Sequence, residues 1–295
     1  MRHLYPVDKK ILLVNADDFG RHELINKAVE EGLLHGMIRS ATVMVTARAF
    51  DGAVELARKY PQLSMGIHFT LVDGRPVLPP DQIPSLVQAG TGVFYPDHGA
   101  FVKHFLKGRV RLSEVRAECE AQLEKFLQTG LVPTHADSHQ HMHVLPGIID
   151  VVLDLCVRAG IPAVRIPAIP VDLLDTRPAN LGEQVGRAGL HILAERARRK
   201  AERRGLGAPD HFGGIVAGRA VDSACIRTLL LGARSGVTEI MLHPGLDDAV
   251  LQADSHWDHS YETELAAVTD PANLELAREL GVELGNFRIF ASSRS

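Results

Sequence analysis

Residues 11–20 read Ile-Leu-Leu-Val-Asn-Ala-Asp-Asp-Phe-Gly, and the interpretation of the whole chain starts from them. The run of four branched apolar residues, bounded by Lys10 and Gly20, is typical of a strand buried in a parallel sheet. Asp17 and Asp18 follow at the end of this strand. Burying an ionised carboxylate costs several kcal/mol unless a positive charge or hydrogen bonds compensate. A metal ion would compensate, provided that further ligands follow along the chain.

Further ligands do follow, at two later strand ends. Residues 66–68 read Gly-Ile-His, and residues 137–143 read Asp-Ser-His-Gln-His-Met-His. Histidine and aspartate are common ligands of divalent metals in catalytic sites. The sequence therefore indicates a metal site assembled from several strand ends.

Strand-like and helix-like segments alternate along the chain. Strands are expected at 11–16, 41–46, 64–71, 132–137, 163–167 and 237–243, with a weaker one at 213–217 and a last one near 283–290. Amphipathic helices are expected at 22–35, 50–59, 113–128, 147–159 and 271–280. Such alternation is typical of βαβ units and a mainly parallel sheet.

Local signals place two of the helix starts. Ser113 is expected to cap the helix that begins there, and Asp270 precedes Pro271 at the first turn of the last helix. Gly281 follows that last helix, so its sequence has the usual proline-first, glycine-last asymmetry. Residues 195–204 are strongly basic and read as a solvated helix face.

The expected fold is α/β: a single irregular (β/α) barrel, TIM-barrel-like, with mainly parallel strands. The 295 residues suit one such domain spanning 1–295, because these barrels commonly have about 250 residues. Residues 72–112 carry several prolines and glycines, so this stretch is expected to form a long, mostly loop-like insertion. Loops of this length are usually functional.

Composition narrows the class of protein. Apolar residues make up 45% of the chain and charged residues 23%, which is typical of a globular protein, and the net charge of −4 gives no bulk reason to bind nucleic acid. No signal peptide or transmembrane stretch is evident. The three scattered cysteines, Cys119, Cys156 and Cys225, suggest no disulfide framework. We therefore expect a cytoplasmic protein without nucleic-acid partners.

Polar, titratable residues mark five separate strand ends of the expected barrel, where barrel enzymes hold their catalytic groups. These residues are Asp17 and Asp18, His68, Asp137 and His139, Arg165, and His243. A single histidine at a strand end would most simply be a packing residue. The joint pattern points to one site.

The histidine-rich segment after the fourth expected strand supplies one metal ligand in this interpretation. Its alternate residues from His135 to His143 would share a strand face but span too great a length to reach one ion. We expect the chain to turn after His139, which is the preferred ligand. His141 and His143 would instead make loop hydrogen bonds or orient a ligand.

A ligand set of one carboxylate and two imidazoles leaves coordination positions open, as in sites that activate water or polarise a carbonyl. The second aspartate of the pair is then available as a general base. His243, in the sequence Met241-Leu242-His243-Pro244-Gly245, is placed to protonate a leaving amine. A hydrogen-bonded histidine at a strand-to-loop junction is the alternative reading of His243.

Four motifs together resemble the YdjC-type carbohydrate deacetylases. They are Asn-Ala-Asp-Asp-Phe-Gly at 15–20, Gly-Ile-His at 66–68, Thr-His-Ala-Asp-Ser-His at 134–139 and His-Pro-Gly at 243–245. The resemblance implies an irregular (β/α) barrel that uses one divalent metal to remove N-acetyl groups from amino sugars.

The same resemblance implies roles for individual residues. His68 and His139 match metal ligands, Asp18 matches the third ligand and Asp17 the base, although adjacency alone would allow these two aspartates to exchange roles. His243 matches the general acid. The resemblance places two further residues, Asp137 and Arg165, next to the substrate or behind the ligands, where Asp137 could orient a histidine.

The substrate and the metal stay open at this level. Residues 71–80 resemble the hopanoid-biosynthesis-associated branch, whereas residues 137–139 look more like the general branch, so the substrate could be chitooligosaccharide-like or a lipid-linked amino sugar. Mg2+ and Zn2+ both suit the ligands, with Co2+ and Mn2+ also possible. The alternatives are hydrolysis of another amide or ester, phosphoesters included, and a non-catalytic metal- or sugar-binding module. A homodimer is expected only because two-fold assemblies are common.

Overall fold

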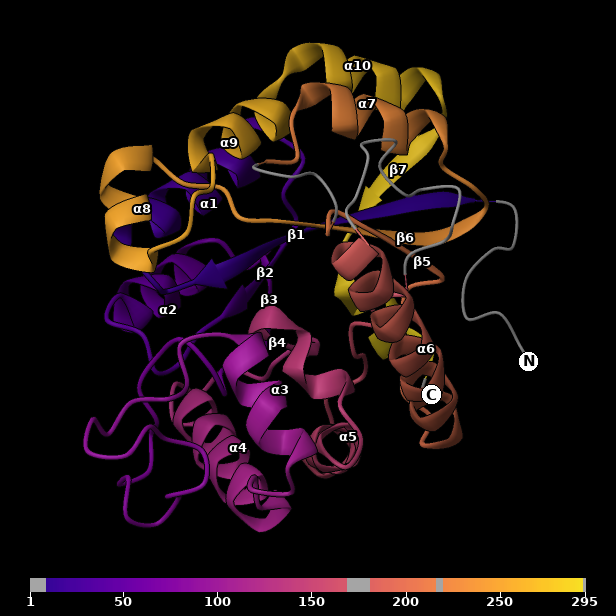
Figure 1. The fold of residues 1–295 in the computed structure, drawn as a ribbon. Helices are drawn as coiled ribbons and strands as arrows, with labels where there is room; N and C mark the ends of the chain where they lie inside the picture. Colours follow the sequence, from indigo (N-terminus) through magenta and orange to yellow (C-terminus); the bar gives the residue numbers. More distant parts are fainter. Residues whose placement is uncertain (1–8, 169–180, 216–219, 294–295) are drawn as a thin grey trace.

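Strand β1 (Lys10–Phe19) lies within a parallel sheet whose order is β4-β3-β2-β1-β6-β5. The computed structural model describes residues 9–168, 181–215 and 220–293 (Figure 1). The run 11–14 is buried on both faces of the sheet, as its composition requires. The other strands are β2 (Ser40–Val43), β3 (Ser64–Phe69), β4 (Ala136–Ser138), β5 (His211–Gly213), β6 (Gly236–Leu242) and β7 (Val282–Gly285).

Strand β7 completes the edge of β1 that β2 leaves uncovered. β6 pairs with one edge of β1 from Lys10 to Ala16. Along the other edge, β7 pairs with residues 10–13 and β2 with residues 15–19. The last strand in the sequence therefore pairs with the first.

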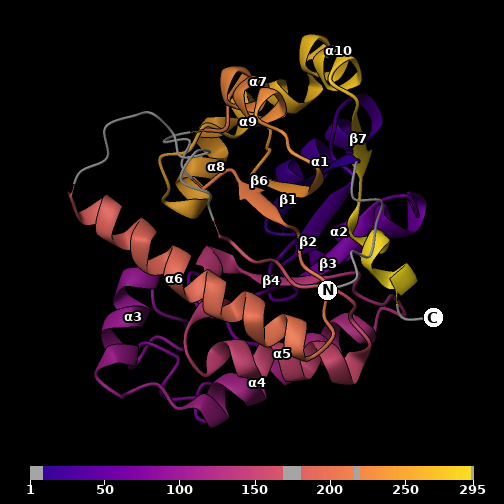
Figure 2. The ribbon, with the colours of Figure 1, turned by 90° about the vertical axis from the view of Figure 1, so that its right-hand side faces the viewer.

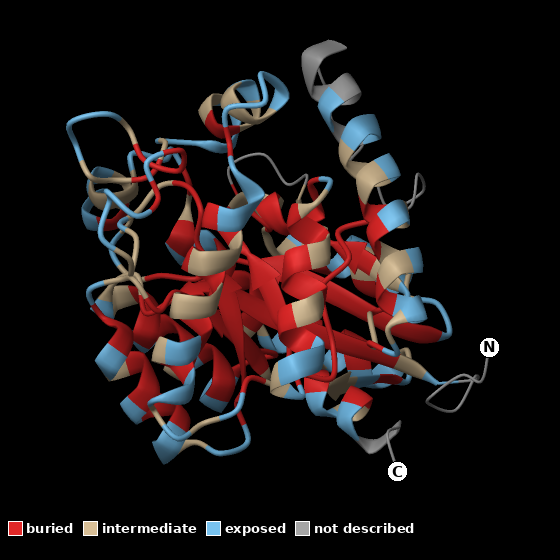
Figure 3. Ribbon diagram, turned by 90° about the horizontal axis from the view of Figure 1, so that it is seen from below, coloured by how far each residue is buried: buried red, intermediate tan, exposed pale blue. Residues whose placement is uncertain are grey.

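The α-helices lie around the outside of the sheet (Figures 1 and 2). Figures 1 and 2 show α1 and α7–α10 on one side and α3–α5 on the other. In Figure 3 the strands are buried at the centre, and exposed residues lie on the outward helix faces. The helices are α1 (Glu23–His35), α2 (Phe50–Lys59), α3 (His98–Leu106), α4 (Leu112–Leu127), α5 (Ile148–Ala159), α6 (Leu181–Arg203), α7 (Ser223–Leu231), α8 (Asp248–Ser255), α9 (Tyr261–Thr269) and α10 (Pro271–Glu279), with 3-10 segments η1 (His139–Val144) and η3 (Phe287–Ser293). No helix among the described residues is both long and apolar enough to cross a bilayer.

The strand face turned away from the main helical core is built in two layers. Ile11 and Leu13 of β1 pack in a separate apolar cluster with side chains from β6, η3 and the segment after α5. Side chains alternate along a strand, so Asn15 and Asp17 continue the same face above this cluster. The buried polar layer at the strand ends thus lies directly on this apolar cluster.

Isolated bridges carry the sheet beyond β4 toward β5. Ala136 of β4 pairs with Val164, and the neighbouring Ala163 pairs with Gly207, a few residues before β5. The sheet is therefore curled so that its two edges approach each other. This arrangement confirms the expected α/β, barrel-like class with parallel strands.

Several element boundaries differ from the sequence predictions. The expected strand at 163–167 has only isolated bridges, and the one at 132–137 is reduced to β4. The final stretch 283–290 is strand only as far as Gly285 and then becomes η3. Of the weak strand at 213–217, residue 213 ends β5, while residues 216–217 lie outside the described residues.

The helix-cap predictions had mixed outcomes. Asp270 caps α10 as predicted, because its carboxylate accepts from the backbone N–H of Ala272. The prediction for Ser113 was wrong: α4 begins at Leu112, after Arg111, which makes no side-chain cap. Ser113 is the second residue of the helix, two positions past the cap position.

The insertion at 72–112 contains helix α3 and is held against the barrel by buried side chains of α4. The Glu118 carboxylate accepts from the backbone N–H groups of Val77 and Leu78, at 2.8 and 3.0 Å. Gln122, one turn later, bonds both backbone groups of Thr70, at 2.9 and 2.7 Å. The stretch is therefore ordered although much of it is loop.

Candidate metal centre

A β-bulge at the end of β1 brings both aspartates of the pair to the same site. Ala16 pairs with Ala41 of β2 and Phe19 with Val43, so β1 has one residue more than β2 in this interval. Asp18 lies within the bulge and has a φ of +57°. Without the bulge, neighbouring residues of a strand would point to opposite faces.

Three donor side chains from different strand ends meet at this bulge. Asp18, His68 at the end of β3 and His139 after β4 offer ligand atoms that all lie within 4.8 Å of one another. His68 Nε2 lies 3.3 Å and His139 Nδ1 2.9 Å from Asp18 Oδ1. The structure therefore brings together the three residues expected to be ligands.

Two of these donor atoms have no hydrogen bond although they are buried. Among the described residues, neither Asp18 Oδ1 nor His68 Nε2 has a partner with hydrogen-bond geometry. Buried polar atoms are nearly always satisfied, so such a pair needs a compensating group. A divalent cation fits this donor set, because carboxylate oxygen and imidazole nitrogen are its usual ligands.

Strand register explains how His68 is oriented. His68 of β3 and Asp137 of β4 are paired positions in neighbouring parallel strands, so their side chains lie on the same face. Asp137 Oδ1 lies 2.6 Å from His68 Nδ1, which directs Nε2 toward Asp18. A carboxylate behind a ligating histidine fixes its ring and raises its basicity.

The electrostatics of the group favour a positive charge. Burial opposes protonation of His68, but Asp137 and Asp18 outweigh it and raise its pKa to about 10. Burial likewise lowers the pKa of His139, yet Asp18 and Asp73 raise it above its usual value overall. The pKa of Asp18 is well below its usual range: burial raises it, and His139, His68 and Arg21 lower it more.

The chain also turns after His139, as expected. Gln140 and His141, which follow it in η1, both have positive φ, at +50° and +58°. This reversal separates His141 from the ligand group and keeps His139 at the strand end. Tight reversals of this kind are rare for residues other than glycine.

Asp73 and Arg21 extend the site and were missed in the sequence. Asp73 Oδ2 lies 3.3 Å from His139 Nε2 and accepts a hydrogen bond from Arg21 at 2.9 Å. Arg21 also lies 3.7 Å from Asp18. Their positions just after the ends of β1 and β3 are the signal that could have identified them.

A fully buried guanidinium organises the polar layer beneath the ligands. Arg165 donates to both oxygens of Asp17, each at 2.6 Å, and to Glu239 of β6 at 2.7 Å. Its Nη1 also lies 2.6 Å from Asp137. Arg165 thereby links the candidate base to the carboxylate that orients His68.

Glu239 is the second buried acid that sequence reasoning missed. Burial is the main cause that raises its pKa, to about 7, and Arg165 only partly offsets it. Its Oε2 has no hydrogen-bond partner among the described residues. It stands within the strand sequence Thr-Glu-Ile, opposite Leu13 of β1, where no pattern distinguishes it from a solvent-facing residue.

His143 supports the site from below. The hydroxyl of Ser138 lies 2.7 Å from His143 Nδ1 and accepts from the His143 backbone N–H, and His143 Nε2 lies 3.0 Å from the carbonyl oxygen of Arg165. Burial lowers the pKa of His143 to about 4, so the ring is neutral and donates to that carbonyl. His143 therefore holds the backbone that carries Arg165.

His141 lies apart from the three donors. Its ring packs edge-on against Phe212 and His143, at 6.0 and 6.4 Å between centroids. Burial, with Arg165 nearby, lowers its pKa well below the usual value. A neutral packing residue is the role that these contacts describe.

His243 follows β6, next to the end of β1. Its backbone N–H donates to Glu264 of α9, which also accepts from Val221. Burial lowers the pKa of His243, while Asp18 and Asp17 oppose that shift. The imidazole thus belongs to the same electrostatic environment as the aspartate pair.

A second group of possible ligands lies around His243. His243, His259 and Glu264 offer donor atoms within 4.8 Å of one another. Both oxygens of Glu264, however, already accept backbone N–H groups. In the group around Asp18, by contrast, the carboxylate oxygen Oδ1 accepts no hydrogen bond from the described residues, and all three residues are buried.

Comparison with known proteins places this geometry in a family. The family model described as "YdjC-like protein" matches residues 11–279. The chain belongs to the YdjC-like family. The matched region holds the three donor residues, Asp17 and His243.

Relatives within the YdjC-like family carry related names. A protein of Geobacillus stearothermophilus named carbohydrate deacetylase is 33% identical over 94% of this chain and 97% of its own length. A Salmonella paratyphi B protein named chitooligosaccharide deacetylase is 29% identical, covering 95% and 98%. A solved Enterococcus faecalis V583 structure, titled as a candidate cellobiose-phosphate cleavage protein, has a TM-score of 0.77 and 27% identity, covering 95% and 98%. This similarity holds over almost the whole fold.

Proposed function

We propose that this protein is a metal-dependent carbohydrate deacetylase that hydrolyses an N-acetyl group from an amino-sugar substrate. The observation that carries the proposal is the meeting of Asp18, His68 and His139, with buried and unsatisfied donor atoms, in a chain of the YdjC-like family. Relatives over nearly its full length are named carbohydrate or chitooligosaccharide deacetylases. We assign the chain to one catalytic domain.

Asp18, His68 and His139 would hold one divalent cation, with Zn2+ or Mg2+ as the first candidates and Co2+ or Mn2+ also compatible. Bound there, the cation supplies a Lewis acid for water and for the amide carbonyl. Asp137 holds the His68 ring in the orientation that presents Nε2.

Asp17 is the proposed base. Both its oxygens accept from Arg165, and Asn15 also donates to Oδ1, at 2.8 Å. A carboxylate oxygen has two lone-pair directions, so Oδ2, which receives only the Arg165 bond, keeps one for the proton of the attacking water. The fixed orientation favours proton transfer without a search among rotamers.

His243 is the proposed acid. The water oxygen bonds to the amide carbon while its proton passes to Asp17, and the C–N bond then breaks as His243 gives a proton to the nitrogen. The products are acetate and the free amine. Glu264 of α9 accepts the backbone N–H of His243 and so holds the backbone that carries the imidazole.

The test is acetate release by the purified protein from N-acetylglucosamine, chitobiose and a lipid-linked amino sugar. Acetate is expected from at least one, chelator is expected to abolish it and added divalent metal to restore it. Cellobiose phosphate belongs in the same panel because of the name of the Enterococcus relative. Activity that persists after verified metal removal, or phosphate release without acetate, would contradict the proposal.

Asp17→Asn and Asp18→Asn separate the two aspartate roles. Asp17→Asn is expected to keep bound metal while turnover falls by roughly 10²–10⁴-fold, the usual contribution of a general base. Asp18→Asn is expected to lose the metal itself, as measured by elemental analysis. Glu279→Gln, an exposed carboxylate-to-amide change on α10, serves as the control for both. Loss of metal in Asp17→Asn would exchange the two roles.

A further inference from the structure

Trp257 is the single tryptophan of the chain and lies beside the candidate acid. Its indole ring meets the His243 ring edge-on, with 4.9 Å between centroids and an angle of 87°. The side chain lies on the loop between α8 and α9 and is 40% exposed. A large aromatic surface thus stays open to solvent within contact distance of the site.

The loop holds this indole in a fixed orientation. His259 stacks on it at 3.9 Å, with the two rings within 19° of parallel. Gln252 of α8 donates to the His259 carbonyl oxygen at 2.7 Å, and the Tyr261 hydroxyl donates to Ser255 at 2.9 Å. A surface that is already ordered loses less entropy when a ligand binds.

Helix α8, which precedes this loop, is tied to the candidate metal centre by charge. Asp254, near the end of α8, lies 3.8 Å from Arg21 and 2.9 Å from Arg48. Arg21 in turn bonds Asp73, which contacts His139. The position of the indole is therefore coupled to the groups around the candidate ligands.

The pairing of an exposed indole with adjacent polar groups suits a sugar ring. A pyranose presents C–H groups on its faces and hydroxyls around its edge, so it can stack on an aromatic surface while its edge forms hydrogen bonds. The other exposed large apolar side chains in the described part of the chain are aliphatic. Trp257 is the one with the required ring face.

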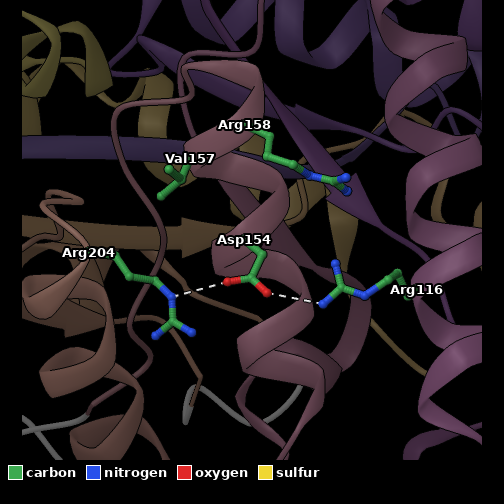
Figure 4. A pocket seen from close by; sticks show the side chains of 5 residues that line it. All are labelled: Arg116, Asp154, Val157, Arg158 and Arg204. Atoms are coloured by element: carbon green, nitrogen blue, oxygen red, sulfur yellow. Dashed lines mark hydrogen bonds and ion pairs between the residues drawn. The ribbon is translucent and has the colours of Figure 1, made fainter.

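A hollow between α4, α5 and α6 is a weaker candidate for a ligand site. Its guanidinium groups are neutralised by carboxylates. Arg116 and Arg204 pair with Asp154 at 3.0 and 3.3 Å (Figure 4). Arg158 pairs with Glu120. The hollow therefore offers no unpaired cation to an anionic ligand. It lies on the outer helices, which carry none of the donors described above.

We propose that Trp257 is the stacking surface of a sugar subsite and binds the pyranose ring that carries the acylated nitrogen. This placement rests on the proposed function: His243 must reach the departing nitrogen, and Trp257 lies against His243. The pyranose ring attached to that nitrogen then lies over the indole. His259 is the positioning residue that holds the indole ring in this orientation.

Steady-state kinetics of acetate release test the subsite. Trp257→Ala is expected to raise KM by roughly tenfold for N-acetylglucosamine and chitobiose alike, the effect of losing a stacking contact. Trp257→Phe keeps a smaller ring and is expected to raise KM by about two- to threefold, and kcat should change less than KM in both variants. Leu231→Ala, at a 60% exposed site on α7, is the control and should leave KM unchanged.

Intrinsic fluorescence supplies a second readout, because all tryptophan emission comes from Trp257. In Asp17→Asn, which holds the substrate without turning it over, the acetylated sugar is expected to shift the emission to shorter wavelength with saturation. Equal KM values for Trp257→Ala and wild type, with acetate still released, would overturn the subsite alone. An effect on chitobiose but not on the monosaccharide would overturn the ring assignment. Absence of acetate from every sugar overturns the proposed function and the subsite together.

Discussion

The backbone of Asp18 adopts a φ of +57°, a region that costs a residue with a side chain roughly 1–2 kcal/mol. Aspartate tolerates this region better than most residues because its short side chain can bond locally. The conformation makes a bulge in β1, and the bulge lets two consecutive carboxylates serve one site: Asp17 meets Arg165 and Asp18 meets the two histidines. Local strain at one residue thus produces the division of roles between neighbours.

Glu239 provides a prediction about pH at the same scale. Burial raises its pKa from the model-compound value of 4.5 to about 7, so the native state favours the protonated acid. Below the unfolded value the shift has no effect on stability; between 4.5 and 7 the unfolded chain ionises first, and native stability falls as pH rises. The full loss above pH 7 is on the order of 3 kcal/mol.

Glu239→Gln should therefore remove much of this pH dependence. The free energy of unfolding, measured in urea at pH 5 and pH 8.5, is expected to fall less with pH in this variant than in the wild type. Glu283→Gln, an exposed change on β7, is the matched control and should behave like the wild type. The same decrease in Glu239→Gln and wild type would contradict a buried, proton-holding Glu239.

At the scale of elements, local signals predicted helices better than strands. The ends of α2 agree with the periodic pattern at 50–59, and the Asp270 cap is read directly from the chain, because capping depends on neighbours in sequence. Strand ends depend on partners elsewhere, so the stretch at 163–167 has the right composition but only isolated bridges. The basic stretch at 195–204 was identified as helical, yet the length of α6 was not.

The candidate site could likewise be predicted from the sequence only in part. The sequence predicted that Asp18, His68 and His139 lie at one edge of the sheet, because parallel strands end on the same side. The convergence of Arg165 on Asp17 and two other carboxylates depends on how the sheet curls, which no local pattern specifies. Trp257 and Glu239 lie on a loop and a strand without a distinguishing motif, so they required the structure.

Helix α4 offers a prediction about how the insertion is held. Glu118→Ala removes the acceptor of the backbone N–H groups of Val77 and Leu78 and leaves them unsatisfied in a buried region. The expected loss in unfolding free energy is roughly 2–4 kcal/mol. Limited proteolysis within residues 72–112 should also become faster.

The control for this variant lies on the same helix. Glu120→Ala removes a more exposed carboxylate that pairs with Arg158, so its cost should stay below about 1 kcal/mol. Similar stability losses in the two variants would mean that Glu118 does not hold the insertion. Unchanged proteolysis in Glu118→Ala would lead to the same conclusion.

For the molecule as a whole, folding concentrates negative charge that a cation can offset. Asp17, Asp18 and Asp137 lie buried around the barrel end, and Arg165 is the buried guanidinium that faces Asp17 and Asp137. The carboxylates around His68 and His139 raise the pKa values of both imidazoles, so this region favours positive charge. Metal binding should therefore stabilise the native state.

Thermal unfolding measures that stabilisation. Zn2+ or Mg2+ at about 100 times its Kd is expected to add about 2.7 kcal/mol to the free energy of unfolding, which raises Tm by several degrees. Chelator should reverse the increase, and Asp18→Asn should not show it. Glu279→Gln should respond like the wild type. An equal increase in Asp18→Asn would place the stabilising metal elsewhere.

The pairing of β7 with β1 also has a consequence for synthesis. Lys10 leaves the ribosome long before Val282, its register partner, because Val282 lies far along the chain. Until β7 and η3 have been synthesised, residues 10–13 lack the strand that covers one of their edges, and the apolar cluster of Ile11 and Leu13 lacks the side chains of η3. Contacts of such large sequence separation slow folding. The barrel can close completely only when β7 and η3 have left the exit tunnel.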